Sequence, residues 1–300
     1  MGGFTRVGFA PLVLFLALCD YTSGYSGLLG VKVASVRTGS TVELGSELQA
    51  ATASGQRVVC VFGTYPADFN AIEYAQRVKH YLPKLRERGV GKVFFVVNGQ
   101  AEAATKLAEL VDLDQSDVEL LADPDGVAGR AFGVSRGWRP DDGELSPYIK
   151  LFGMLFGLGA WATLPAVLGG YIGNPFVAQP WIVDALSQGQ RAGRWPNNAL
   201  ELDTSGAVVV NKFAELPLVG GWPRRPLELA TLRLQNMMDI SIKNWDALRP
   251  EDQHLKVLTQ LGGCLILGAG GETILDYKDP GICAVLNFEN ALNKLDAAKA

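Results

Sequence analysis

The chain has 300 residues, 48% of them hydrophobic, which is enough for one large domain or two small ones with an ample core. Its formal net charge is -4, so it lacks the basic excess of a nucleic-acid-binding surface, and we expect no nucleic-acid partner. With two histidines and no cysteine pair at ligand spacing, a histidine- or cysteine-rich metal centre is hard to assemble, and a carboxylate site for a hard cation is an alternative without a signal in the sequence. We expect no metal site and no cofactor.

Residues 1–26 have the features of a signal segment. Arg6 precedes the uncharged apolar run 7–19, which is too short to span a bilayer, and small and polar residues follow. Residues 27–42 contain cations but no acidic residue, a bias typical of transit peptides or of a flexible segment. We therefore expect the folded domain to occupy residues 43–300. We also expect a plastid location, in the stroma or at thylakoids, with secretion as the alternative.

The first part of the domain alternates strands and helices. The apolar run 58–62 predicts a buried strand, and apolar residues three or four positions apart predict a helix over 68–89. A second strand at 92–97, a helix at 101–111 and a third strand at 118–121 continue the pattern. Strands alternating with helices imply right-handed βαβ crossovers, so we expect an α/β fold.

An apolar insertion, residues 140–225, interrupts this pattern. No charged residue occurs between 151 and 183. The stretch 151–172 is long enough for a transmembrane helix, but Pro165 and several glycines favour two buried or amphipathic helices. A helix lying on a membrane surface is a third interpretation. The rest of the insertion predicts a long irregular connection with one strand at 207–210.

The last part of the chain predicts a helix, a hairpin and a helix. Pro226 begins a helical run with apolar residues on most sides, which favours a position between the core and the insertion. In that position Arg233 would be either exposed or paired. A glycine-rich turn between apolar runs predicts a β-hairpin over 264–277, and a helix is expected at 287–295.

Four strings suggest a family. They are the reactive-turn segment VVCVFGTYPAD at 58–68, ADPD at 122–125 with AFGV at 131–134, QLGG at 260–263, and RPLELATLRLQNM at 225–237. In this order they resemble peroxiredoxin-like proteins of the AhpC/TSA type, in a cyanobacterial and plastid subgroup. The resemblance implies a thioredoxin-like fold, a central mixed sheet flanked by helices, with the large, mainly helical insertion before the last helix-hairpin-helix part.

The reactive turn of that family would lie at residues 64–68, and this chain has no sulfur there. Peroxiredoxins place a cysteine three residues after a threonine, which here gives Ala67 after Thr64. The peroxiredoxin-like type has a Cys-Pro-x-Cys turn, and its cysteine positions here hold Tyr65 and Asp68 around Pro66. Because the thiolate is the nucleophile, we expect no catalytic residue in the turn. Asp68 is better explained as a helix N-cap.

These observations favour a catalytically degenerate protein with a binding or scaffold role in a plastid, in one version at thylakoid membranes. We expect a protein partner to dock on the insertion, and 151–172 is the candidate membrane contact. The alternative is a thiol-dependent antioxidant oxidoreductase that uses Cys283, Cys60 or Cys264. Cys283 is the best candidate because a loop is expected before it, although no cation beside it in the sequence favours its thiolate.

Two further sets of residues remain open. Tryptophans in or beside the insertion would be either interface anchors or core fillers: Trp138, Trp161, Trp181, Trp195 and Trp222. A third, ligand-binding function would use a pocket left by the lost chemistry, for which the candidate residues are Tyr65, Asp68, Gln260, Arg130 and Arg136.

Overall fold

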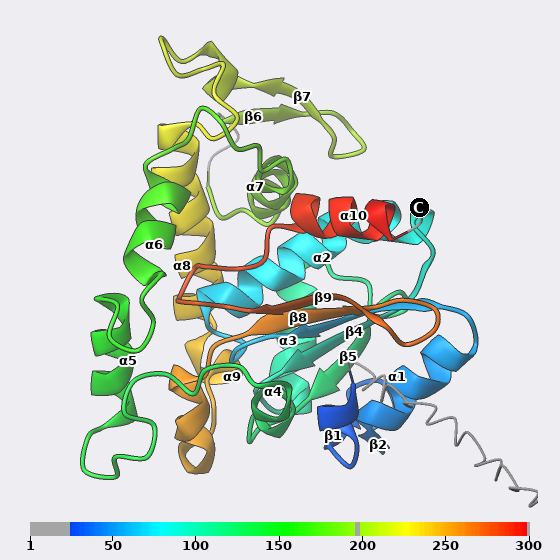
Figure 1. The fold of residues 1–300 in the computed structure, drawn as a ribbon. Helices are drawn as coiled ribbons and strands as arrows, with labels where there is room; N and C mark the ends of the chain where they lie inside the picture. Colours follow the sequence, from blue (N-terminus) through cyan, green and yellow to red (C-terminus); the bar gives the residue numbers. More distant parts are fainter. Residues whose placement is uncertain (1–24, 196–198, 299–300) are drawn as a thin grey trace, which may run out of the picture.

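The structure is a computed structural model that describes residues 25–195 and 199–298 (Figure 1). A seven-stranded mixed sheet lies at its centre, with the spatial order β2-β1-β5-β4-β3-β8-β9. Strands β3, β4 and β5 are parallel neighbours, and β8 runs antiparallel to both β3 and β9. The strands are β1 Lys32–Ser35, β2 Thr41–Glu43, β3 Arg57–Phe62, β4 Val90–Val97, β5 Glu119–Ala122, β8 Gly263–Leu267 and β9 Thr273–Lys278.

Helices cover both faces of this sheet. Successive side chains of a strand point to opposite faces, so the fully buried Val59 and Cys60 of β3 belong to two different layers of the core. Helices α2, α3 and α10 pack on the Val59 face, and α1 and α4 pack on the Cys60 face. Their bounds are α1 Leu44–Ala53, α2 Phe69–Glu87, α3 Ala101–Val111, α4 Val127–Phe132 and α10 Phe288–Ala297.

This arrangement is a thioredoxin-like fold, as the sequence predicts. The three apolar runs form β3, β4 and β5, and the late hairpin forms β8 and β9. One boundary differs from the prediction, because the folded part begins before residue 43. Strand β1 lies within 27–42 and pairs with β5, with Ala34 opposite Ala122. The side chain of Val33 is buried in the core, so this segment is ordered, whereas residues 1–24 of the expected signal lie outside the described residues.

The described residues of the insertion form three α-helices, a short 3₁₀ helix at Lys212–Glu215 and a small hairpin, with α5 and α6 at the left of the core and the rest above it in Figure 1. The α-helices and the strands of the hairpin are α5 Pro147–Leu155, α6 Thr163–Tyr171, α7 Trp181–Arg191, β6 Leu200–Leu202 and β7 Val208–Asn211. The expected pair of helices is present, but the chain breaks at residues 156–162, around Gly157 and Gly159, and Pro165 lies in the first turn of α6 rather than at the break. Within residues 25–195 and 199–298, no helix is both long and apolar enough to cross a membrane.

The helix after Pro226 begins with a π-helical segment, Glu228–Arg233, and continues as α8, Leu234–Lys243. A short helix α9, Trp245–Leu248, follows it. The π-helical segment contacts α6 and α7, and α8 contacts α2, so the run lies between the insertion and the core as predicted. π-Helical turns are rare and often occur at functional sites.

Candidate functional site

The turn that joins β3 to α2 is buried. Tyr65 and Ala67 are only 6% and 2% exposed, respectively. The ring of Trp245 in α9 meets the Tyr65 ring edge-on, with 6.4 Å between the centroids, and the hydroxyl of Ser241 in α8 donates to the Ala67 carbonyl at 2.7 Å. The Thr64 carbonyl accepts the Asn98 amide at 3.1 Å. The helices after the insertion therefore close the turn from solvent.

Asp68 takes the N-cap position of α2, as expected, with extended backbone angles of φ -76° and ψ 142°. Its side chain forms no capping hydrogen bond of good geometry. Burial raises the pKa of its carboxyl to about 6, although the backbone amides of Phe69 and Asn70 lie close enough to oppose this rise. Pro66 packs on Gly99, where an added Cβ would lie 2.8 Å from Pro66 Cδ, so a glycine is needed at that position.

Cys60 and Cys264 lie in the neighbouring strands β3 and β8 and are both fully buried. Their side chains belong to opposite layers of the core. Burial raises the pKa of each thiol well above its ordinary value, so the protonated form predominates at neutral pH. These two cysteines pack as small hydrophobic side chains.

Cys283 lies in the loop after β9, on the same edge of the sheet as the reactive turn, because β9 and β3 both run antiparallel to β8. Its backbone has a φ of 62°, and its amide donates to Asn70 Oδ1 at 2.7 Å. Burial raises the pKa of its thiol to about 12; nearby Glu73 raises it further and Arg233 opposes the rise. The sequence showed no cation near this cysteine, because Arg233 comes from a distant part of the chain.

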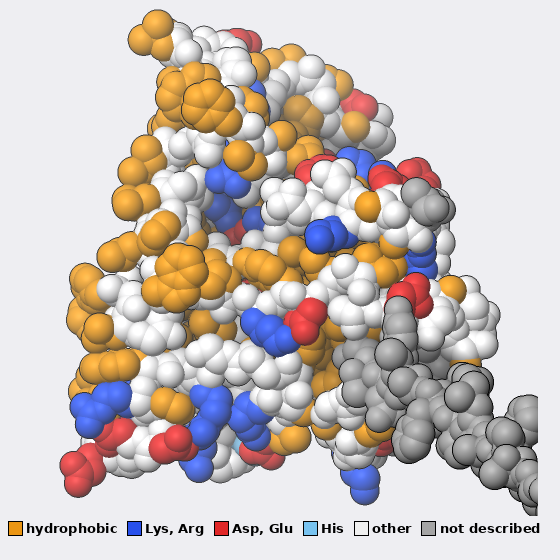
Figure 2. Space-filling view, in the orientation of Figure 1, with side chains coloured by type: hydrophobic (Ala, Val, Ile, Leu, Met, Phe, Trp, Pro, Cys, Tyr) orange, Lys and Arg blue, Asp and Glu red, His pale blue; other side chains and the backbone are white. Residues whose placement is uncertain are grey.

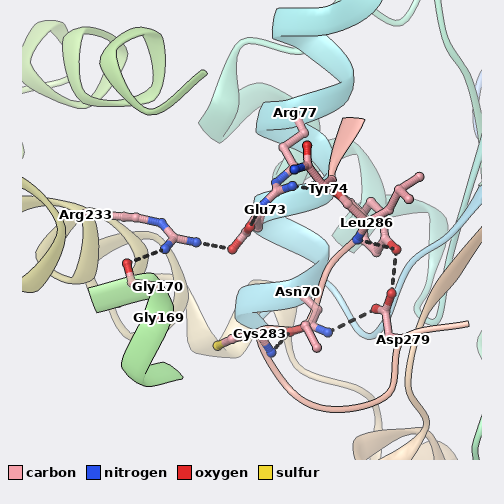
Figure 3. A network of polar contacts seen from close by, with 12 residues as sticks. Asn70, Glu73, Tyr74, Arg77, Gly169, Gly170, Arg233, Asp279, Cys283 and Leu286 are labelled. Carbon is pink, nitrogen blue, oxygen red and sulfur yellow. Dashed lines mark hydrogen bonds and ion pairs between the residues drawn. The ribbon is translucent and has the colours of Figure 1, made fainter. Parts of the chain in front are cut away.

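Three buried charges meet on the side of α2 that faces the insertion (Figure 3). The Glu73 carboxylate pairs with Arg77, one turn later in the same helix, through one oxygen and with Arg233 of the π-helical segment through the other. Arg233 also donates to the Gly170 carbonyl of α6 at 3.2 Å. The sequence predicted only that Arg233 is exposed or paired, and the structure shows it paired.

A second buried network holds the Cys283 loop (Figure 3). Asp279 is 2% exposed and accepts the Tyr74 hydroxyl at 2.6 Å and the Asn70 side-chain amide at 3.2 Å. Burial raises the pKa of the Asp279 carboxyl to about 7. Because Asn70 bonds both Asp279 and the Cys283 amide, this network fixes the loop against the first turn of α2.

The structure separates the residues predicted to line one vacated pocket. Arg130, Arg136 and Gln260 line a surface pocket of about 410 Å³, and Tyr65 and Asp68 do not. Arg130 donates to the Gln260 side-chain oxygen at 3.3 Å, and Arg136 pairs with Asp141 at 2.6 Å. In the described part of the chain, no group of three His, Cys, Asp or Glu side chains is placed to hold a metal ion.

The tryptophans of the insertion region differ widely in burial, and the buried ones fill the core. Trp181 is 1% exposed and stacks on two guanidinium groups, those of Arg77 and Arg233, while Trp195 is also buried. Trp161, between α5 and α6, is 75% exposed. Trp138 and Trp222 are half-buried. The sequence could not separate these cases because the burial of each ring depends on segments that tertiary packing brings together.

Comparison with known proteins supports one family. The family described as AhpC/TSA antioxidant enzyme matches residues 77–281, more than half of the chain. The match begins inside α2, after the reactive turn, and ends just beyond β9. No curated protein and no solved structure matches the chain. On the extent of the family match, together with the thioredoxin-like fold, the chain belongs to the AhpC/TSA antioxidant enzyme family.

Proposed function

We propose that this protein is a binding or scaffold member of the AhpC/TSA family that has lost the thiol chemistry of the reactive turn. The first support for the loss of chemistry is the sequence of the turn. Residues 64–68 contain no sulfur, and a peroxide-reducing turn needs a thiolate. Packing gives independent support, since the rings and helices over Tyr65 and Ala67 leave no room for a substrate. Restoring peroxide reduction would therefore require both a cysteine in the turn and an opening in the helices that cover it.

The observation that carries the binding role is an apolar face on α5 and α6. Figure 2 shows hydrophobic side chains gathered along the edge of the molecule that these helices form. Phe156 is 62% exposed and Phe176 is 89% exposed. Exposed apolar patches of this kind mark interaction sites in soluble proteins. The exposed members of this apolar face are Ile149, Phe152, Leu155, Phe156, Leu158, Trp161, Leu164, Leu168, Ile172 and Phe176.

The apolar face is suited to a partner at a membrane. No charged residue occurs in 151–183, and Trp161 and two phenylalanines, Phe152 and Phe156, supply the aromatic groups that favour the interface of a bilayer. The opposite side of α5 packs inward through Met154, which is fully buried. We place the contact at thylakoid membranes of a plastid, where a protein partner docks on residues 140–225 and lipid contacts 151–172. The N-terminal sequence supports this address.

Fractionation tests this function directly. The mature protein is isolated by affinity from plastid membranes and from stroma, and the recovered partners are compared. A triple variant, Phe152→Ser, Phe156→Ser and Trp161→Ser, removes the centre of the apolar face, and Leu29→Ser removes an exposed apolar side chain outside the insertion. We expect the parent and the Leu29 variant in the membrane fraction and the triple variant in the stroma. A parent protein that is wholly soluble and monomeric contradicts the proposal.

One observation favours the alternative, a thiol-dependent oxidoreductase. Cys283 is half-buried, lies at the sheet edge that carries the reactive turn, and is close enough to Arg233 for the guanidinium to favour its thiolate. Burial outweighs this effect, and a pKa of about 12 leaves little thiolate at neutral pH. Peroxide consumption by the parent and by Cys283→Ser, Cys60→Ser and Cys264→Ser variants separates the two functions. A rate that falls only with Cys283→Ser supports the alternative.

A further inference from the structure

A pocket of about 220 Å³ lies between the core and the insertion. Its wall combines the second and third turns of α2, one side of α6, Arg224, Arg233 and the loop that carries Cys283. Figure 3 shows Arg77 and Arg233 directed at Glu73, with the Cys283 side chain nearby. Neither the apolar face nor the reactive turn contributes to this pocket, so it is a separate feature of the molecule.

The pocket has an excess of positive charge. Three guanidinium groups line it, those of Arg77, Arg224 and Arg233, whereas Glu73 is the acidic side chain in the lining. Arg77 and Arg233 are each 4% exposed, so solvent screens their charges weakly. Burial, together with repulsion from the other two arginines, lowers the pKa of Arg224 to about 10. Arg225, next in the chain, is neutralised by Glu228 and does not line the pocket.

Around these three arginines, hydrogen-bond donors outnumber acceptors. The Nε–H groups of Arg77, Arg224 and Arg233 are buried and have no hydrogen-bond acceptor within the described residues. Arg224 uses one terminal nitrogen, which donates to the Gly169 carbonyl at 2.8 Å, and has no carboxylate partner. Trp181 stacks on the other two guanidinium groups at 4.9 and 5.1 Å, which stabilises the cations but supplies no acceptor. Buried unpaired donors cost free energy, and because these nitrogens have almost no accessible surface, an anion in the pocket would interact with them chiefly through charge.

We propose that this pocket binds a small, doubly charged oxyanion, a phosphate or sulfate group or a short dicarboxylate. Two positive charges remain after Glu73 is paired, which matches the charge of such an anion. The second terminal nitrogen of Arg224 has no partner within the described residues, and it is a charged N–H donor of the kind that phosphate and carboxylate oxygens accept from. The bound anion would join the core to the insertion, because Arg224 and Arg233 are already tied to the carbonyls of Gly169 and Gly170 in α6.

The test uses the purified full chain and three anions as probes: inorganic phosphate, sulfate and succinate. Each is compared with chloride at the same ionic strength and at neutral pH, by titration calorimetry and by the shift in Tm. We expect saturable binding and a raised Tm with at least one probe, since a ligand that binds only the folded state stabilises it. Phosphate or sulfate binding assigns the ligand to the phosphoryl or sulfuryl class, and binding of succinate alone assigns it to dicarboxylates.

Arg224→Gln is the decisive variant because it removes a guanidinium group without breaking either ion pair of Glu73. We expect its affinity for the probe to fall about tenfold or more, the loss typical of one charge-assisted contact. Arg249→Gln, an arginine outside the pocket that pairs with exposed Asp252, is the matched control and should bind as the parent does. Should the glutamine variant fail to fold, Arg224→Lys keeps the charge and should also bind more weakly. Equal effects of all probes and chloride, or undiminished binding by the Arg224 variants, overturn the proposal.

Discussion

Arg233 pairs with Glu73 across 160 residues of sequence, and both side chains are almost completely buried. The pair joins the π-helical segment that follows the insertion to the second turn of α2. A single carboxylate therefore pairs with two arginines, since Arg77 uses its other oxygen, and the three groups together keep one positive charge. This junction fixes the insertion on the core, and the predicted effects of several variants follow from it.

Replacing Glu73 should destabilise the fold strongly. Glu73→Gln leaves Arg77 and Arg233 buried with no carboxylate, and removing one partner of a buried ion pair typically costs about 3–5 kcal/mol. Glu109→Gln is the matched control, because its partner Lys106 is exposed and surface pairs contribute about 0–1 kcal/mol. Urea unfolding of the two variants measures the free energies of unfolding. Equal losses for both would contradict the role of Glu73 as the central anion.

Stability should depend on pH through Asp279. Its pKa is raised from an ordinary value of 3.8 to about 7 by burial, so the folded state binds more protons than the unfolded state between these values. The contribution of this group is therefore fully present below the unfolded pKa and is lost as the pH rises through the folded pKa. We expect the parent to lose about 1–3 kcal/mol between roughly pH 5 and 8 from this group. Asp279→Asn should flatten that decline, and Asp252→Asn, at an exposed carboxylate, should not.

Much of the fold was predictable because the sheet depends on local patterns. The apolar runs of β3 and β4, the glycine turn of the hairpin and the spacing of apolar residues in α2 are all short-range signals. Strand β1 was missed because it has only four residues, and only Val33 and Ser35 of them are buried. Its partner β5 lies more than 80 residues later, so no local signal reveals the pairing.

The polar junction could not be predicted in the same way. Along α2, Glu73 and Arg77 are charged residues of the kind a helix normally presents to solvent, and they are buried because the insertion, the π-helical segment and the loop after β9 cover that side. The sequence located the reactive turn from neighbouring residues, whereas the pocket around Arg224 and Arg233 depends on segments brought together by tertiary packing. A buried cation next to Cys283 was invisible for the same reason.

Placing a cysteine in the reactive turn should not create a peroxidase. Ala67→Cys restores sulfur three residues after Thr64, but this position is 2% exposed and lies against Ser241 of α8. Burial in apolar surroundings raises a thiol pKa and blocks access, so we expect no peroxide consumption and slow alkylation of the new thiol in the folded state. Rapid alkylation after unfolding is the control that the thiol is present. Peroxide reduction at an enzyme-like rate would show that the turn opens in solution.

The two kinds of tryptophan in the insertion should respond oppositely to truncation. Trp181→Ala removes a ring that is 1% exposed and that stacks on the guanidinium groups of Arg77 and Arg233, so we expect a loss of about 3–5 kcal/mol. Trp161→Ala removes a ring that is 75% exposed, and its effect on unfolding should stay within about 0.5 kcal/mol. The share of protein recovered in the membrane fraction should show the opposite order. Trp161→Ala should lower it and Trp181→Ala should not, because Trp161 belongs to the apolar face and Trp181 does not. A Trp161 variant that is destabilised as much as the Trp181 variant would show that this ring packs within the molecule, which removes the main support for a docking surface on α5 and α6.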